Sequence, residues 1–247
     1  MQIIKDMKEN KKLKGKLLLT GKIKVITGLA IGGNKSGIDI GALDNPVIKY
    51  RNGNNYYPYI PGSSLKGKIR SLLAKVAGFE SERQDKAAMK KDGDFKHLAT
   101  LFGYGAGQND KQSGAGLLKF NDSFLKDEKL EVTEEKMENT IDRISGKANP
   151  RPLERVLPDS IFEVNLILDV YDEQEAEEHL KLLDLGIQLL NQDYLGGGGT
   201  RGNGRVEMRT KIKEYLEVDT QSKKLNNKLE DTQSFKNFKF TYEYEKN

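Results

Sequence analysis

The segment PGSSLKGKIRSLL, residues 61–73, places glycine, serine and lysine at a spacing close to that of a nucleotide-binding loop. Gly62, Gly67 and Lys68 match the phosphate loop of nucleoside triphosphatases, in which the next residue is a serine or threonine that binds Mg²⁺. Ile69 stands at that position here, and the preceding YYPYI contains a proline instead of forming a buried strand. A nucleoside triphosphatase is therefore the least favoured hypothesis.

The same residues suit a sugar–phosphate backbone. Lys66 and Arg70 would lie one turn apart on one flank of a helix that begins near Ser64, with Lys68 on the other flank. The N–H groups at a helix start, serine hydroxyls and nearby cations together favour a phosphodiester. An ordinary surface helix with solvated lysines could have the same sequence. These residues alone therefore leave open whether the helix binds phosphates or is only a surface helix.

A second glycine-rich loop, GGGGTRGNG at 196–204, contains the letters of the dinucleotide fingerprint G-x-G-x-x-G. That fingerprint follows a strand and opens a helix, whereas this loop is expected to follow a helix and lead into a strand. Its bare backbone would let another chain approach closely and would present N–H groups to an anion, with Arg201 and Arg205 adding charge. A flexible connector is the alternative.

His97 and His179 are the only histidines in the chain. An acid–base ribonuclease built on two histidines would need them side by side. His97 belongs to a polar insertion and His179 to the acidic face of a helix, so we predict packing or surface roles for them. The chain also lacks the usual histidine and calcium-loop spacings, and we expect no structural metal.

Hydrophobic periodicity predicts the elements that must hold these residues. The expected strands are 17–27, 116–124, 161–170 and a short one near 205–209, and the expected helices are 64–78 and 174–192. Ser63 or Ser64 would cap the first helix and Gly78 would end it. The order β-α-β-β-α-β is the ferredoxin-like plan, so we predict an α+β fold.

We expect one domain that covers residues 15–210 and an extension that covers 211–247. The predicted insertions are an irregular loop at 28–62, a helical insertion at 80–115 and a polar segment at 126–158. In the extension, aromatic and polar residues alternate over 238–244, which predicts an added strand on a sheet edge or on a neighbouring subunit.

Composition limits the class of protein. The 247 residues are 36% hydrophobic and 32% charged, and no apolar run approaches the roughly 20 residues of a membrane span. The absence of cysteine and of an apolar leader fits a cytoplasmic protein that has no membrane contact. The net charge is only +4, but lysines gather between Lys5 and Lys24, which favours a polyanionic partner.

Six stretches spread over residues 20–210 together resemble one known family. They are TGLAIGG (27–33), GALDNPVIK (41–49), IPGSSLKGKIRSLL (60–73), LFG (101–103), ENTIDRISGKANPRPLERV (138–156) and LGGGGTRGNGRV (195–206). The family is the repeated backbone subunit of type III-A CRISPR ribonucleoprotein effectors, in the repeat-associated mysterious protein (RAMP) superfamily. No single stretch is specific, but the set is.

The resemblance implies an RRM-related, ferredoxin-like core that forms a filament with other copies of itself along a CRISPR guide RNA, beside the other type III-A subunits. The first helix and the glycine-rich loop would hold guide phosphates. The insertion 126–158 would be a thumb hairpin that wedges into the duplex of guide and target RNA and flips out base pairs. The implied RNA-binding residues are Ser64, Lys66, Lys68, Arg70, Asn139, Thr140, Ile141, Arg143, Arg151, Arg155, Gly198, Gly199, Thr200 and Arg201.

The resemblance also implies that one aspartate, which falls on Asp44, cleaves the complementary target RNA beside each flipped position. By itself, Asp-Asn-Pro is also a good turn sequence. One carboxylate would suffice, because RNA supplies its own 2′-hydroxyl as the nucleophile. The carboxylate would position Mg²⁺ or Mn²⁺ or accept the hydroxyl proton. Asp39, five residues earlier, is more simply a solvated loop residue.

Two positions depart from the family pattern. Ala30 stands where many members have a histidine, and Asn203 stands where relatives often have an aromatic residue. The expected function is a guide-dependent, metal-dependent endoribonuclease of antiviral defence. The alternative is a non-catalytic guide-binding backbone subunit or end-capping paralogue, in which Asp44 is only a turn residue.

Overall fold

The main sheet is built around strand β1, Gly15–Val25. This strand pairs antiparallel with β10 (Ile161–Val170) on one side and with β11 (Val206–Asp219) on the other. Beyond these, β6 (Leu118–Phe120) pairs with β10 and β12 (Lys224–Asn227) pairs with β11. The order β12-β11-β1-β10-β6 is that of the β-α-β-β-α-β plan with one added edge strand, so the predicted α+β fold is confirmed.

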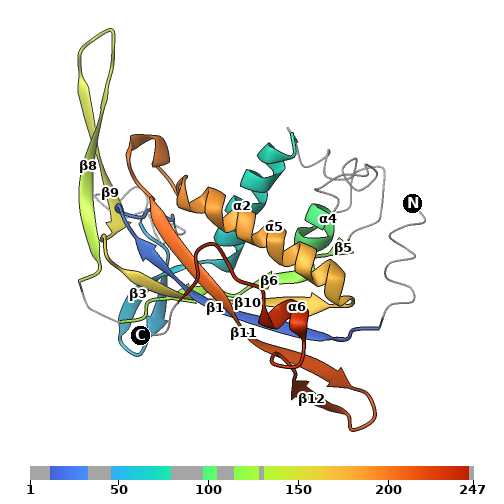
Figure 1. The fold of residues 1–247 in the computed structure, drawn as a ribbon. Coiled ribbons are helices and arrows are strands. Elements are labelled where there is room, and N and C mark those ends of the chain that lie inside the picture. Colours follow the sequence, from blue (N-terminus) through green and yellow to red (C-terminus); the bar gives the residue numbers. More distant parts are fainter. Residues whose placement is uncertain (1–11, 33–45, 79–96, 105–113, 128–130, 245–247) are drawn as a thin grey trace.

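Helices α2 (Gly62–Val76) and α5 (Glu173–Asn191) cover one face of this sheet, and the short helix α4 (His97–Phe102) lies near them (Figure 1). The computed structural model describes residues 12–32, 46–78, 97–104, 114–127 and 131–244. No helix among these residues is both long and apolar enough to span a bilayer.

The period-two pattern of the strands explains the core. In β1, the residues Leu17, Leu19, Ile23 and Val25 are at most 1% exposed, and they alternate with partly exposed residues. The neighbouring strand β10 has the same alternation of buried and exposed residues. The apolar side chains of both strands therefore lie on the sheet face that the helices cover. The helices contribute stripes at helical spacing, which include Leu65, Ile69, Leu72 and Leu73 on α2 and Leu180, Leu183, Ile187 and Leu190 on α5.

The two helices approach closely because α5 has a glycine at their contact. A Cβ atom at Gly186 would lie 2.6 Å from Cγ2 of Ile69 and 3.1 Å from Cδ1 of Leu73. This contact fixes α2 against α5, and it therefore also fixes the end of α5 from which the glycine-rich loop leaves.

The start of α2 differs from the prediction. Neither Ser63 nor Ser64 caps the helix, because the N-cap residue is Pro61 and no side chain of the cap accepts a hydrogen bond. Instead, the N–H of Gly62 donates to Oδ1 of Asp122 at 2.8 Å. A carboxylate from the strand connection therefore takes the place that sequence patterns assign to a local hydroxyl.

The insertion predicted as an irregular loop at 28–62 contains two strands. β2 (Lys49–Asn52) and β3 (Asn55–Ile60) form a hairpin, and β7 (Ser123–Phe124) pairs with the far end of β3. The turn between them contains Gly53 with φ of 60°, a conformation that favours glycine. The loop prediction is wrong here, because the Asn-Gly turn and three tyrosines of β3 are a hairpin signal.

The insertion 126–158 forms a long hairpin of β8 (Thr133–Ile141) and β9 (Ala148–Val156). The pairing is continuous from Thr133↔Val156 to Ile141↔Ala148, and the hairpin projects well beyond the body of the molecule (Figure 1). In the insertion that was predicted to be helical, the described residues form α4 and two short strands, β4 (Gly103–Tyr104) and β5 (Gly114–Ala115).

The extension does not form the strand predicted at 238–244. The chain forms the short helix α6 (Gln233–Lys236), and Phe235 packs edge-on against Tyr215. The last described residues do reach the edge of β11, where Thr210 exchanges backbone hydrogen bonds with Tyr242 and Tyr244. The residues before Tyr242 do not extend this pairing along β11, because Phe240 is buried in the core.

Several lysines that suggested a basic N-terminal surface are paired with acids. Lys24 lies 2.7 Å from Asp159, and Lys16 lies 2.5 Å from Asp169, a carboxylate that Lys119 also contacts. The sheet face away from the helices is therefore a mixed surface, and its lysines contribute little positive potential.

Replacing Gly186 by leucine should lower the free energy of unfolding by about 1–3 kcal/mol, because the added side chain overpacks the α2–α5 contact. Gly67→Ala on α2 is the matched control, since no atom lies within 4 Å of its Cβ position. The control should raise stability by about 0.5–1 kcal/mol. Urea unfolding measures both, and equal stabilities of the two variants would contradict the proposed contact.

Candidate nucleic-acid interface

The glycine-rich loop is a closed, hydrogen-bonded turn rather than an unstructured connector. Before the loop, the side-chain amide of Asn191 exchanges two hydrogen bonds with the backbone of Met208, at 2.7 and 3.0 Å. The N–H of Leu195 then donates to the carbonyl of Gly204 at 2.8 Å, which closes the loop. The glycines at 196, 198, 202 and 204 have φ between 72° and 86°, which other residues rarely adopt. The predicted RNA-binding residues 198–201 lie in this turn.

Lys68 links helix α2 to the glycine-rich loop. Its ammonium nitrogen lies 3.0 Å from the carboxylate of Asp193 and 3.8 Å from the centre of the Tyr194 ring. Gly199 packs against the same ring, since a Cβ atom there would fall 2.0 Å from a ring carbon. The charge of Lys68 is therefore already balanced, and its predicted phosphate contact stays a prediction.

Lys66 and Arg70 form a cationic pair on the other flank of α2. Burial, and then the charge of Arg70, lower the pKa of Lys66 below its ordinary value. Lys66 makes no ion pair with any residue that the structure describes. Burial and the charge of Arg70 both disfavour the charged form of Lys66, so an anion bound at Lys66 would be stabilised more than one at Lys68, whose charge Asp193 balances. Ser64, one turn before Lys68, is partly exposed on the Lys68 side of the helix.

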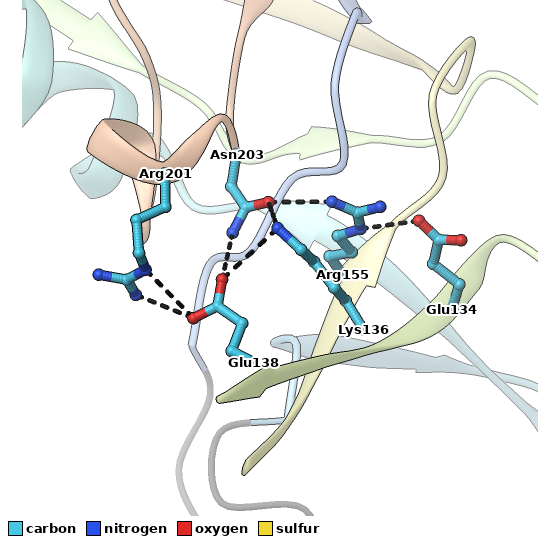
Figure 2. A network of polar contacts seen from close by, with 6 residues as sticks. All are labelled: Glu134, Lys136, Glu138, Arg155, Arg201 and Asn203. Atoms are coloured by element: carbon cyan, nitrogen blue, oxygen red, sulfur yellow. Dashed lines mark hydrogen bonds and ion pairs between the residues drawn. The ribbon is translucent and has the colours of Figure 1, made fainter. Parts of the chain in front are cut away.

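The base of the β8–β9 hairpin meets the glycine-rich loop in a polar network (Figure 2). Glu138 of β8 accepts hydrogen bonds from Nε and Nη2 of Arg201, at 3.2 and 3.0 Å. Its other oxygen accepts from Nδ2 of Asn203 at 3.4 Å and lies 3.6 Å from the ammonium of Lys136. The hydrogen bond from Arg201 lowers the pKa of Glu138, which keeps this carboxylate ionised.

Arg155 of β9 completes the network. Its Nε donates to Glu134 at 2.7 Å, and its Nη1 donates to Oδ1 of Asn203 at 3.0 Å (Figure 2). Gly28 packs on its side chain, because a Cβ atom at that glycine would lie 2.2 Å from Cδ of Arg155. Of the residues predicted to bind RNA, Arg155 and Arg201 are thus joined to hairpin carboxylates in this state of the protein.

Glu134, Lys136 and Glu138 are not among the residues predicted from the sequence, although a signal for them exists. In TEEKMEN these three residues occupy alternate positions of one strand, so they share a face. All three are partly buried, while Glu135 and Met137 between them are exposed. A period-two row of charges in a projecting strand therefore indicates a face that contacts another element.

The far part of the hairpin holds the remaining predicted residues. Asn139, Thr140, Ile141, Arg143 and Arg151 are all exposed there. The arginines at 143 and 151 make no ion pair within the described ranges. All five residues line an open hollow of about 1240 Å³, together with Arg201 from the glycine-rich loop.

A smaller hollow of about 390 Å³ lies on the other side of the glycine-rich loop. It is lined by Thr27, by residues 192–194 at the end of α5 and by Gly199, Gly202, Asn203 and Arg205 of the loop. The hydroxyl of Thr27 accepts a hydrogen bond from the backbone N–H of Arg205 at 3.0 Å, so this wall is fixed. The loop therefore contributes to the walls of two hollows that a strand of nucleic acid could follow.

Comparison with known proteins identifies the family of this chain. A model of the RAMP superfamily matches residues 22–207 of this chain. The chain belongs to the RAMP superfamily. Within it, this RAMP chain is 45% identical over 200 residues to the "CRISPR system Cms endoribonuclease Csm3" of Streptococcus thermophilus, covering 77% of this chain and 86% of that one. The resemblance seen in the sequence motifs is therefore confirmed.

One further relative and one solved structure are also similar to this chain. A protein of the same name from Methanocaldococcus jannaschii is 38% identical over 234 residues, covering 90% of this RAMP chain and 92% of its own length. The crystal structure of Methanopyrus kandleri Csm3 has a TM-score of 0.50 at 21% identity, with 85% of this chain and 79% of that chain covered. At that identity the structural match speaks for the fold alone.

Asp44 and Asp39 lie outside the described residues of this RAMP chain. The described residues on either side of the segment 33–45 pair with each other, since Gly32 and Val47 form a β-bridge. Val47, three residues after Asp44 in the chain, donates its N–H to buried Glu154 of β9 at 2.9 Å. Among the described residues no three His, Asp or Glu side chains lie close enough to hold a metal ion.

The two histidines lie side by side, which the sequence analysis did not anticipate. Their ring centres are 5.0 Å apart, and the ring of His97 on α4 meets that of His179 on α5 edge to face. His179 is only 1% exposed, and burial lowers its pKa to about 3, so it is neutral at neutral pH. A group so enclosed packs α4 against α5 and does not exchange protons with a polynucleotide.

The lowered pKa of His179 should make the fold sensitive to acid. Since the unfolded pKa is near 6.5 and the folded one about 3, this contribution is complete above pH 6.5 and is lost as pH falls toward 3. Each pH unit in that window costs at most about 1.4 kcal/mol. His179→Phe should therefore flatten the fall in Tm between pH 6.5 and 4.5, measured by thermal unfolding. Parallel Tm curves for the two proteins would refute this.

Proposed function

We propose that this chain is a backbone subunit of a type III-A CRISPR effector complex, and that it binds the guide RNA and cleaves the paired target RNA. Its relatives at 45% and 38% identity are both named CRISPR endoribonucleases. The structural observation that carries the proposal is the projecting β8–β9 hairpin whose base is tied to the glycine-rich loop. A protein that holds a guide and a target RNA needs two surfaces. One follows the backbone of the guide, and the other divides the duplex of guide and target.

The guide backbone would lie along α2 and the glycine-rich loop. Lys66 and Arg70 offer two cations on one flank of the helix, and Ser64 offers a hydroxyl on the flank of Lys68, where Tyr194 brings the bare backbone of the loop at 198–201 close. Arg201 would exchange its Glu138 partner for a guide phosphate, because its side chain is 64% exposed and can reorient. Such an exchange preserves the hydrogen bonds of the guanidinium.

The hairpin would act on the duplex of guide and target. Met137 and Ile141 are 59% and 61% exposed, and Ile144 in the turn is fully exposed. Exposed apolar side chains on a projecting element suit insertion between bases, as in proteins that kink nucleic acid. Arg143 and Arg151 supply cations beside them, and Asn139 and Thr140 supply hydrogen-bond donors and acceptors for the RNA backbone.

Cleavage would use the target's own 2′-hydroxyl. A flipped base bends the backbone, which can bring that hydroxyl in line with the adjacent phosphate. Asp44 would then accept the hydroxyl proton, and the products would be a 2′,3′-cyclic phosphate and a 5′-hydroxyl. A carboxylate is also a suitable ligand for Mg²⁺ or Mn²⁺, which when bound would stabilise negative charge on the phosphate.

The proposed setting is a cytoplasmic ribonucleoprotein. The partners would be the guide RNA, the complementary target RNA, other copies of this chain in a filament and other effector subunits. The alternative is a non-catalytic backbone or end-capping subunit. Only the behaviour of Asp44 separates the two, because both would bind the guide through the same helix and loop.

Asp44→Ala in the reconstituted complex should abolish target cleavage, by at least roughly a hundredfold, while target binding stays unchanged. Asp39→Ala is the matched control and should cleave normally. A target with a 2′-deoxy nucleotide at the scissile position should resist cleavage in the same way, because the nucleophile is absent. Cleavage and binding are measured on labelled RNA, and normal cleavage by Asp44→Ala would favour the non-catalytic alternative.

Lys66→Ala and Arg70→Ala should each weaken guide binding and reduce the slope of log K against log salt by roughly one, as one phosphate contact is lost. Lys68→Ala should change the slope less, because Asp193 already balances its charge. Lys75→Ala, in the last turn of the same helix, is the control and should leave the slope unchanged. Equal slopes for all four variants would argue against a guide contact at Lys66 and Arg70.

A further inference from the structure

Asn203 is buried where three segments of the chain meet. Its residue is 1% exposed, and the partners of its side chain all come from the hairpin: Lys136, Glu138 and Arg155. A buried amide without partners would be strongly destabilising, so these contacts hold the hairpin and the glycine-rich loop together. Gly198 leaves room for the amide, because a Cβ atom there would lie 2.6 Å from Nδ2 of Asn203.

The side-chain amide of Asn203 places its acceptor next to cations and its donor next to a carboxylate. Its oxygen faces the two cations, with Arg155 at 3.0 Å and Lys136 at 3.5 Å, and its nitrogen donates to Glu138 at 3.4 Å (Figure 2). An aspartate at this position would repel Glu138, and an apolar residue would take one hydrogen-bond partner away from each of the three charged groups. Few other side chains can offer both an acceptor and a donor in so small a space.

The third segment is the one that leads to and from residues 33–45. Leu29 and Val156 exchange backbone hydrogen bonds of 3.0 and 2.7 Å, and the N–H of Gly204 donates to the carbonyl of Gly28 at 2.9 Å. On the other side, Glu154 of β9 is bonded to Val47 and Lys49. Both described flanks of this segment are therefore attached to the last residues of β9, next to Arg155.

We infer that Asn203 is a positioning residue, which together with Arg155 sets the hairpin at a fixed angle to the glycine-rich loop and to the described residues on either side of the segment 33–45. Arg155 takes part in this attachment, because its Nε is bonded to Glu134 and its Nη1 to Asn203. The inference rests on the proposed function, since the segments it aligns are those proposed to hold the guide, divide the duplex and cleave the target.

The test compares Asn203→Asp with a double variant that also carries Glu138→Gln. The single change places two carboxylates side by side, while the double change exchanges amide and carboxylate between the two positions and keeps the net charge of the natural chain. In the isolated full chain, amide hydrogen exchange over 133–156 should quicken roughly tenfold or more in the single variant and return toward the natural rate in the double variant. Asn54→Asp, in the exposed β2–β3 turn, is the control and should match the natural chain.

In the reconstituted complex, the single variant should bind target within roughly threefold of the natural chain, yet cleave it roughly tenfold more slowly or at scattered positions. The double variant should regain both rate and cut positions. Natural exchange rates in the single variant, normal cleavage despite a loosened hairpin, or no recovery in the double variant would each overturn the inference. If the natural complex does not cleave RNA, the proposed function fails, and the exchange measurement still decides whether Asn203 holds the hairpin.

Discussion

The attachment of the β8–β9 hairpin at its base is the interaction on which the proposed interface depends. An isolated two-stranded hairpin is at best marginally stable in water, and most residues of this one are exposed along its outer half. Its orientation therefore comes from its base, where Val156 pairs with Leu29 and where Glu138 and Arg155 meet the glycine-rich loop. Without these contacts, the exposed arginines farther out would have no defined position relative to α2.

Opposite charges balance each other over much of the molecule. Arg155, Arg201 and Lys68 are each within reach of a carboxylate, and so are two lysines of β1, Lys16 and Lys24. Many other cations have no such partner in the described ranges, and Lys66, Arg143 and Arg151 are three of them that lie on the proposed interface. Local placement of charge, and not the net value of +4, determines where a phosphate chain would be held.

Regular elements could be predicted from the sequence where periodicity is strong. The strand 161–170 and the helix 174–192 match β10 and α5 within a residue, because long apolar patterns dominate there. Contacts between distant residues could not be predicted in this way: Asp122 at the start of α2, Asp193 beside Lys68 and the meeting of His97 with His179 all depend on tertiary structure. The strand expected at 238–244 failed for the same reason, since burial of Phe240 outweighs the alternation.

The glycine-rich loop needs its glycines for more than one reason. At 202 the backbone is left-handed and no atom lies near the Cβ position, so the requirement there is torsional; at 196, 198 and 204 it is torsional and also steric. At 199 it is steric, since the ring of Tyr194 occupies the space of a side chain. The glycines of this loop are thus required for different physical reasons. We therefore expect the effect of substitution on folding to differ from one glycine to the next.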